Sequence, residues 1–262
     1  MTRKLSAALA ALLFIVGLQG CTLFRWGGSP TPATPPPQPQ AEDLFKEGES
    51  MLAKGRYDDA RTKYTTVKEK DPERLYEPLV QVRLGDSYYE EARYPEAEVE
   101  YQRFLDLHPH NKAAAYVKYQ IGMCSFKQMD EPDRDPSFSL KSVQQFNELL
   151  KDYPDNPYIA EAKEKLRIAK NSIAEHEFNI GWYYYKRGVY KAAAERFKGI
   201  RETYPGMKNE PDTLYYLADS CIHTGDMDTA KSALAVLYQE YPNNLFAQRA
   251  KNELSGRVGA TK

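Results

Sequence analysis

The sequence contains few of the residues that build reactive sites. It has only 3 cysteines and 4 histidines in 262 residues. The histidines are scattered along the chain, at His108, His110, His176 and His223. None of them lies in a metalloprotease or nucleophile–base motif, and no spacing of cysteine, histidine or carboxylate residues fits a metal site. We therefore expect a protein that is not an enzyme and that needs neither a metal ion nor another cofactor.

An excess of charge of one sign is also missing. Lysine and arginine number 36 and aspartate and glutamate 37, which leaves a formal net charge of -1. Proteins that bind nucleic acids carry clusters of positive charge that neutralise phosphates. The near-neutral balance offers no electrostatic basis for such binding, and we expect no nucleic-acid partner.

Long apolar runs are limited to the N-terminus, where Leu5–Leu18 follows the basic residues Arg3 and Lys4. The run is shorter than the ~20 residues that a membrane-spanning helix needs, so residues 1–20 are predicted to be a signal peptide. Its end, LQGC, is similar to a bacterial lipobox, in which cleavage precedes a cysteine that becomes lipidated, here Cys21. The alternative is an ordinary secretory signal that is cut elsewhere.

A lipidated Cys21 would hold the protein on a membrane, because several acyl chains together give stable anchoring. Thr22 rather than aspartate follows the cysteine, which resembles the sorting rule for outer-membrane lipoproteins. Residues 21–40 are rich in proline and are predicted to form an extended, semi-rigid tether. A proline-rich ligand for SH3-like domains is the less favoured alternative.

Beyond the tether, one pattern occurs five times. Each copy has a small residue, a second small residue, a large apolar residue and a closing proline. The first small residues are Gly48, Gly85, Gly122, Gly181 and Ala218. The prolines are Pro72, Pro109, Pro154, Pro205 and Pro242. The order matches the tetratricopeptide repeat, a pair of antiparallel helices. We predict an all-α protein, an α-solenoid of five tetratricopeptide hairpins, over the alternative of unrelated hairpins with similar composition.

The five copies divide the chain into segments. Repeats one to three are expected in 41–156, with an insertion at 129–138. A long linking helix, repeats four and five and a C-terminal capping helix are expected in 157–254. Residues 255–262 are predicted to be a flexible tail. The other two cysteines, Cys124 and Cys221, lie in non-adjacent repeats and are predicted to be small core residues rather than a disulfide.

The insertion carries Asp133, Arg134 and Asp135. Insertions in repeat proteins lie on one face and often mark a binding surface. Two aspartates of this kind could form a catalytic or metal-binding pair, but no histidine stands near them in the sequence. A salt-bridged turn is therefore the favoured interpretation.

Tyrosine is abundant, with 20 residues. Tyr88 and Tyr184 occupy the structural tyrosine position of their repeats and are expected in the core. Tyr89 and Tyr185 follow by one position and point elsewhere, so they are predicted to line a groove that binds a client polypeptide. Tyrosine suits this role because it combines a large contact area with a hydrogen-bonding tip.

Taken together, these segments resemble the BamD family, also called ComL or YfiO, which comprises lipoproteins of the β-barrel assembly machinery. The resemblance rests on the order of lipobox, proline-rich tether, five repeats and Asp-Arg-Asp-Pro insertion. The most specific segments are YPDNPY at 153–158 and AEHEFNIGWYYYKRGVYKAAAERF at 174–197. It covers nearly all of the chain after the signal peptide.

The resemblance implies a non-enzymatic scaffold, anchored by its lipid at the periplasmic face of the outer membrane. Its C-terminal repeats would bind the POTRA domains of a BamA-like barrel protein, and its N-terminal repeats would receive unfolded outer-membrane proteins. Other lipoproteins of the machinery would be further partners. The resemblance makes Arg196 a contact to an acidic POTRA residue, with Lys198 and Arg201 at the periphery. The alternative for Arg196 is a solvated side chain paired with Glu195 or Glu202.

A second function remains open at the level of sequence. Another outer-membrane lipoprotein with the same repeats, such as a pilotin or a protein associated with peptidoglycan or the Tol–Pal system, would share the fold. The insertion and the long helix favour the assembly scaffold.

Overall fold

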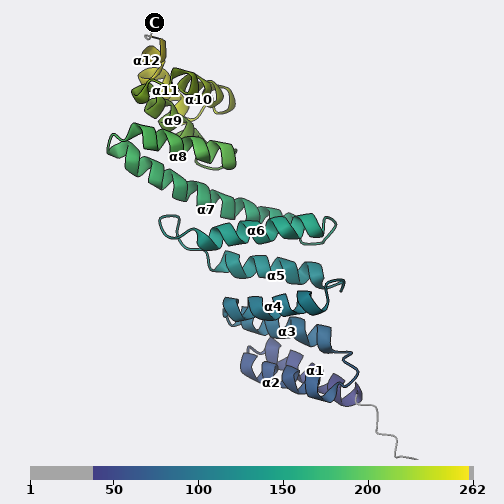
Figure 1. Cartoon of the computed structure of the whole chain (residues 1–262). Coiled ribbons are helices and arrows are strands. Elements are labelled where there is room, and N and C mark those ends of the chain that lie inside the picture. The colour runs from purple at the N-terminus through teal and green to yellow at the C-terminus, as the bar shows by residue number, and fades with distance from the viewer. Residues whose placement is uncertain (1–37, 260–262) are drawn as a thin grey trace, which may run out of the picture. The chain divides into compact units, whose positions relative to one another are not determined.

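The computed structural model describes residues 38–259, which form 12 helices and no strand (Figure 1). The predicted signal peptide, Cys21 and the tether up to residue 37 lie outside the described residues, as do the last three residues. Within residues 38–259, no helix is long and apolar enough to cross a membrane.

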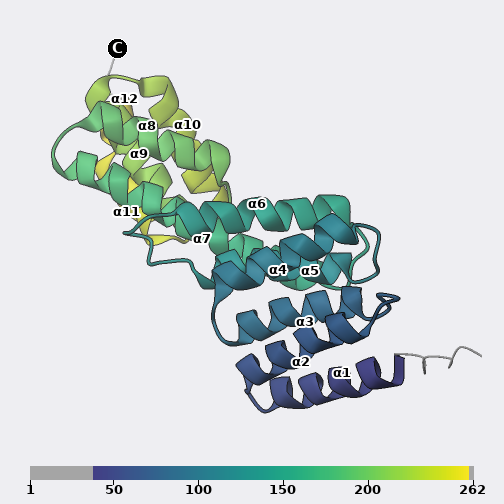
Figure 2. The same cartoon turned by 60° about the horizontal axis from the view of Figure 1, so that its bottom comes forward.

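The helices form five hairpins followed by two short helices. The hairpins are α1 (Gln38–Ala53) with α2 (Tyr57–Lys70), α3 (Glu77–Glu90) with α4 (Tyr94–Leu107), α5 (Ala114–Lys127) with α6 (Ser137–Asp152), α7 (Ile159–Lys186) with α8 (Tyr190–Thr203), and α9 (Glu210–Thr224) with α10 (Met227–Glu240). The short helices are α11 (Leu245–Glu253) and α12 (Ser255–Gly259). Each helix packs against the next along the chain (Figure 2). The predicted all-α solenoid of five tetratricopeptide hairpins is confirmed.

Small residues allow the two helices of each hairpin to approach closely. In repeat one, a Cβ atom added to Gly48 would lie 2.6 Å from the ring of Tyr64. The same relationship joins glycine to a ring in three further repeats, as Gly85 with Tyr101, Gly122 with Phe146 and Gly181 with Phe197. In repeat five the corresponding residues are Ala218 and Leu234, and both are buried. An aliphatic side chain thus replaces the ring where the small residue carries a methyl group.

Helix α7 has 28 residues and joins two parts of the core. Its first half contributes Ala162 and Leu166 to a buried cluster with Phe146 and Leu149 of α6. Its second half contributes Ala174 to the cluster of repeats four and five. The long helix predicted after residue 157 therefore begins at Ile159, and it serves both as an extra layer on repeat three and as the first helix of repeat four.

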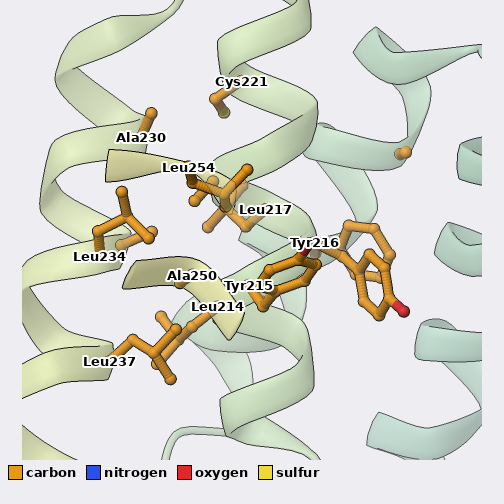
Figure 3. Close-up of a cluster of buried hydrophobic side chains, with 14 of the residues drawn as sticks. Leu214, Tyr215, Tyr216, Leu217, Cys221, Ala230, Leu234, Leu237, Ala250 and Leu254 are labelled. Atoms are coloured by element: carbon orange, nitrogen blue, oxygen red, sulfur yellow. The ribbon is translucent and has the colours of Figure 1, made fainter. Parts of the chain in front are cut away.

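The core of the last two repeats is closed by the C-terminal helices. Ala250 and Leu254 pack with Leu214, Leu217 and Leu237 in one buried cluster (Figure 3). A terminal helix of this kind covers the apolar face that a further repeat would otherwise bury. Helix α11 thus lies where a capping helix was expected.

The helices extend further at both ends than the sequence indicated. Helix α1 begins at Gln38, inside the stretch expected to be tether, because Pro39 fits a first helical turn, where no amide donor is needed. The flexible tail expected from Ser255 instead starts as helix α12. Arg257 Nη1 of α12 lies 2.6 Å from the Asp219 carboxylate of α9, and this long-range contact is invisible in local sequence.

Candidate interaction surfaces

Arg196 lies at the edge of a groove between α6, α7 and α8. Its guanidinium donates to Glu177 of α7 at 2.8 Å, and its side chain is 46% exposed. The groove has a volume of about 490 Å³, and we call it the Arg196 groove. Its lining includes Leu140, Ile173, Glu177, Arg196, Gly199, Ile200 and Tyr204. Arg196 is therefore accessible, and its partner is Glu177 rather than Glu195 or Glu202.

Lys198 and Arg201 do not share this groove. They line a second depression together with residues of α9 and α10, such as Leu217 and Val236. On a helix, residues three apart share a face, whereas residues two apart point in widely different directions. Lys198 and Arg201 are three apart, and Arg196 precedes Lys198 by only two positions. The three basic residues predicted at one interface therefore line two different depressions.

Tyr89 and Tyr185, predicted to line a groove, are half-buried and engaged in contacts. The ring of Tyr185 stacks on Trp182 with centroids 5.5 Å apart, and its hydroxyl donates to Asp219. Tyr89 packs edge-on against Tyr94 at 5.4 Å. Burial is the main cause that raises the pKa of each tyrosine above its ordinary value. Each ring therefore keeps only part of its surface for a client.

The insertion forms a turn whose polar residues have separate roles. Arg134 pairs with Asp130 at 3.8 Å, not with either flanking aspartate. Asp135 accepts hydrogen bonds from the amide and hydroxyl groups of Ser137 at 3.0 and 2.7 Å, and these bonds lower the pKa of its carboxyl. The insertion thus contains the expected salt bridge, although with a different acid, and a bond that fixes the start of α6.

Asp133 lies at a different place, on the rim of a cavity of about 350 Å³ against α7. His176, Ile180, Tyr183 and Tyr184 line the α7 side. The insertion is held to this helix by a 2.9 Å hydrogen bond between His176 Nδ1 and the carbonyl oxygen of Pro132, for which Nδ1 carries the proton.

Several carboxylates that accept hydrogen bonds from tyrosine hydroxyls within the repeats were not predicted from the sequence. In repeats one, two and five, the residue directly after the small residue is acidic, namely Glu49, Asp86 and Asp219. The hydroxyl of Tyr64 donates to Glu49 at 2.6 Å. Those of Tyr101 and Tyr116 donate to Asp86 at 2.7 and 2.8 Å, and that of Tyr185 donates to Asp219. The signal was available in the sequence, as an acid that immediately follows the repeat's first small residue.

Arg83 links two of these acids across repeats one and two. Its Nε donates to Glu49 at 2.9 Å and its Nη1 to Asp86 at 2.8 Å. Since both edges of the guanidinium are occupied, Arg83 serves as an internal tie between the first helices of the repeats rather than as a free anion-binding group.

Chemistry-bearing side chains do not converge elsewhere in the described part of the chain. Among residues 38–259, no three histidine, cysteine or carboxylate groups are arranged to hold a metal ion. Cys124 and Cys221 are buried free thiols, and burial raises their pKa to about 12 and about 11. Such thiols remain protonated at neutral pH, so they are poor nucleophiles.

Comparison with protein families identifies this arrangement. The family model described as YfiO, outer membrane lipoprotein, matches residues 37–225, from the start of α1 to the end of α9. The chain belongs to the YfiO family of outer membrane lipoproteins. A tetratricopeptide repeat model also matches residues 212–244, which contain α10 and most of α9. The family membership predicted from sequence is confirmed.

The names of two relatives agree with this assignment. The chain is 26% identical over 239 residues to the outer membrane protein assembly factor BamD of Caulobacter vibrioides, covering 91% of this chain and 77% of the relative. It is 27% identical over 201 residues to the protein of the same name from Rickettsia prowazekii, covering 77% and 80%. Among solved structures, the TPR2AB-domain:pHSP90 complex of yeast Sti1 is similar with a TM-score of 0.44 and 14% identity, covering 84% of this chain and 87% of the other.

Proposed function

We propose that this YfiO-family protein is an outer membrane protein assembly factor that acts as a scaffold. The observation that carries the proposal is the family match over residues 37–225, together with relatives named as assembly factors over most of the chain. A stack of helical hairpins suits a scaffold because each repeat presents its own surfaces to a partner.

The scaffold is anchored in the outer membrane through acyl chains on Cys21 and works at the periplasmic face. The lipobox-like LQGC and Thr22 support this anchoring. Labelling with radioactive palmitate tests it. Cys21→Ala should abolish the label and release the protein from the membrane fraction, whereas Cys124→Ala should keep both label and location. A labelled Cys21→Ala protein would contradict the anchor.

The main partner is a BamA-like barrel protein with POTRA domains, bound at the Arg196 groove. Two features of the groove support this site. The exposed apolar side chain of Leu140 offers a surface for burial. The Arg196 guanidinium has more donors than the Glu177 carboxylate uses, so it can bind a second carboxylate from the partner.

Co-purification from solubilised outer membranes tests this contact. Tagged full-length protein should recover a POTRA-containing barrel protein in stoichiometric amount, and Arg196→Glu should abolish the recovery. Arg167→Glu is the matched control, because Arg167 is also a half-exposed arginine of a helix, paired with Glu164 at 2.7 Å. Retention by both variants would keep the assembly role and remove the contact. Recovery of pilus or cell-wall factors instead would replace the assembly role by the alternative lipoprotein function.

Unfolded outer-membrane proteins are the clients, and other lipoproteins of the machinery bind the same scaffold. Tyr89 and Tyr185 contribute their remaining exposed edges to client binding. Replacing Tyr89 with alanine should reduce photo-crosslinking of a radiolabelled, unfolded barrel protein, whereas replacing Tyr57, a partly exposed tyrosine at the start of α2, should not. Equal crosslinking to both variants would remove Tyr89 from the client site.

A further inference from the structure

One face of α7 is open where the corresponding face of the other internal repeats is covered. The face is defined by three positions, which lie five before, one before and two after the repeat's first small residue. In repeat three these residues are Val117, Ile121 and Cys124, which are 0%, 7% and 0% exposed. They share a buried cluster with residues of α4, the second helix of the preceding repeat. The preceding helix therefore covers this face.

Repeats two and five follow the same rule. Their residues at these positions are Val80, Leu84 and Ser87 in repeat two and Thr213, Leu217 and Ser220 in repeat five. All six are at most 8% exposed. Val80 and Leu84 share a cluster with residues of α2, and Leu217 shares one with residues of α8. In three repeats, therefore, this face packs against the second helix of the preceding repeat.

Repeat four is the exception. Its residues at the three positions are His176, Ile180 and Tyr183, and Tyr183 is 52% exposed. The cause lies in the length of α7, because the buried cluster that α6 forms with this helix involves the first half of the helix, through Ala162 and Leu166. The insertion covers only one edge of the face, through Pro132 and Asp133.

Repeat one shows the composition of this face where it is exposed to solvent. Nothing precedes α1 in the described part of the chain, and the residues at its three positions are Asp43, Glu47 and Ser50, all polar and exposed. A terminal repeat needs such a polar face for solubility. The face of repeat four carries isoleucine and tyrosine instead. It therefore has the composition of a buried face, although no second helix of the preceding repeat covers it.

We propose that this open face of α7, formed by His176, Ile180 and Tyr183 together with Tyr184 of the same cavity lining, binds an amphipathic helix of a partner protein. The helix takes the place that the second helix of the preceding repeat occupies elsewhere in the array, and it lies antiparallel to α7. Its apolar side chains fill the cavity of about 350 Å³ between the insertion and α7. The site is separate from the Arg196 groove and does not depend on which partner binds there.

Charges at the two ends of the face define the helix further. Asp133 lies at the end near His176 and has no ion pair within residues 38–259. Arg187 lies at the other end, with its Cζ atom 3.7 Å from the centroid of the Tyr183 ring. It also has no carboxylate partner within residues 38–259. A helix antiparallel to α7 places its C-terminus near Asp133 and its N-terminus near Arg187. Basic residues in the last turn and acidic residues in the first turn would match both ends, and they also complement the dipole of the bound helix.

Cysteine accessibility in the full-length protein tests whether the face is covered. The native thiols Cys124 and Cys221 are buried and do not interfere. Tyr183→Cys places a thiol on the open face of repeat four, and Ser50→Cys is the matched control at the same position of repeat one. In purified protein both should react with a maleimide at similar rates. In native outer membranes the thiol at 183 should react about tenfold more slowly, as for occupancy of about nine-tenths, while the thiol at 50 keeps its rate.

Photo-crosslinking in the same membranes identifies the occupant. The photoreactive residue p-benzoylphenylalanine at positions 180 and 183 should attach to residues of one partner segment that are spaced three or four apart, as on one face of a helix. Capture of a protein without this spacing does not support the proposal. Equal maleimide rates at 183 in membranes and in purified protein would overturn it, and so would crosslinks confined to an extended client segment or to residues 22–37 of the same chain. Thermal melts of each variant show that the fold is retained.

The charge argument has its own control. Asp133→Lys should remove most of the maleimide protection at position 183, because it repels the basic end of the bound helix. Asp155→Lys makes the same change of charge on an exposed aspartate in the loop before α7 and should leave the protection unchanged. Equal effects of the two variants would show that overall charge, and not the end of this face, governs binding.

Discussion

The ring of Phe197 lies in the space that a side chain on Gly181 would occupy. A Cβ atom at Gly181 would stand 2.7 Å from the nearest carbon of the ring, well inside normal contact distance. Phe197 is fully buried between α7 and its neighbours, so the ring has little room to move. This contact sets how closely α7 and α8 approach, and with it the position of the surfaces on both helices.

Adding one methyl group at this contact should destabilise the protein. Gly181→Ala is expected to lower the free energy of unfolding by about 1–3 kcal/mol through overpacking. Gly199→Ala is the control, because a Cβ atom there meets nothing within 4 Å, and helix propensity should stabilise that variant by about 0.5–1 kcal/mol. Urea unfolding followed by circular dichroism measures both. Repeat five pairs Ala218 with Leu234, so adding Phe197→Leu to Gly181→Ala should recover part of the loss, and no recovery would contradict the steric account.

Buried tyrosines should make the fold sensitive to alkaline pH. Burial, and then the charge of Asp86, raises the pKa of Tyr101 well above the value of ~10 in an unfolded chain. A raised pKa in the folded state means that its stabilising contribution is complete below about pH 10 and is lost as the pH rises further. Urea midpoints at about pH 8 and about pH 11 measure this loss. Tyr101→Phe should be less stable at pH 8 by about 1 kcal/mol, from the lost hydrogen bond to Asp86, yet should lose less between the two pH values. An unchanged loss would contradict the assignment.

Helix α12 should depend on Asp219. The carboxylate of Asp219 has an exposed fraction of 6% and accepts from Arg257 Nη1 at 2.6 Å. Arg257→Ala is expected to release α12, with faster amide hydrogen exchange in residues 255–259 and a global cost below about 1 kcal/mol, because Arg257 is itself partly exposed. Lys231→Ala, which removes an exposed base of α10, is the control and should leave that exchange unchanged. Hydrogen-exchange mass spectrometry measures the release, and equal exchange in both variants would show that Leu254 alone holds the helix.

The two free thiols should be inert until the protein unfolds. Burial raises the pKa of Cys124 to about 12 and that of Cys221 to about 11, so the reactive thiolate is scarce at pH values near neutrality. Iodoacetamide at about pH 8 should leave both unmodified in native buffer and modify both in concentrated urea. Mass spectrometry of the alkylated protein provides the measurement, with Ser50→Cys as an exposed thiol that reacts in both conditions. Rapid alkylation of Cys124 in native buffer would contradict its burial.

Much of the candidate site could not be predicted from the sequence, for a geometric reason. The three basic residues of α8 lie within six positions of each other, so the sequence grouped them. Side-chain directions on a helix send Arg196 to one groove and Lys198 with Arg201 to another. The partner of Arg196 is Glu177, on another helix, and neither neighbouring glutamate of α8. Tyr89 and Tyr185 were placed on a surface by their offset from the structural tyrosines, but residues of neighbouring helices bury half of each.

The sequence by itself determined the five hairpins and the long helix. These features depend on contacts within one repeat, such as Gly48 with Tyr64, and on helical periodicity, both of which recur at fixed spacing along the chain. Tertiary structure alone decided which faces remain open. The exposure of Tyr183 and the docking of α12 through Asp219 and Arg257 depend on what the neighbouring repeats cover. These features depend on contacts between residues of different repeats, and no local sequence pattern predicts such contacts.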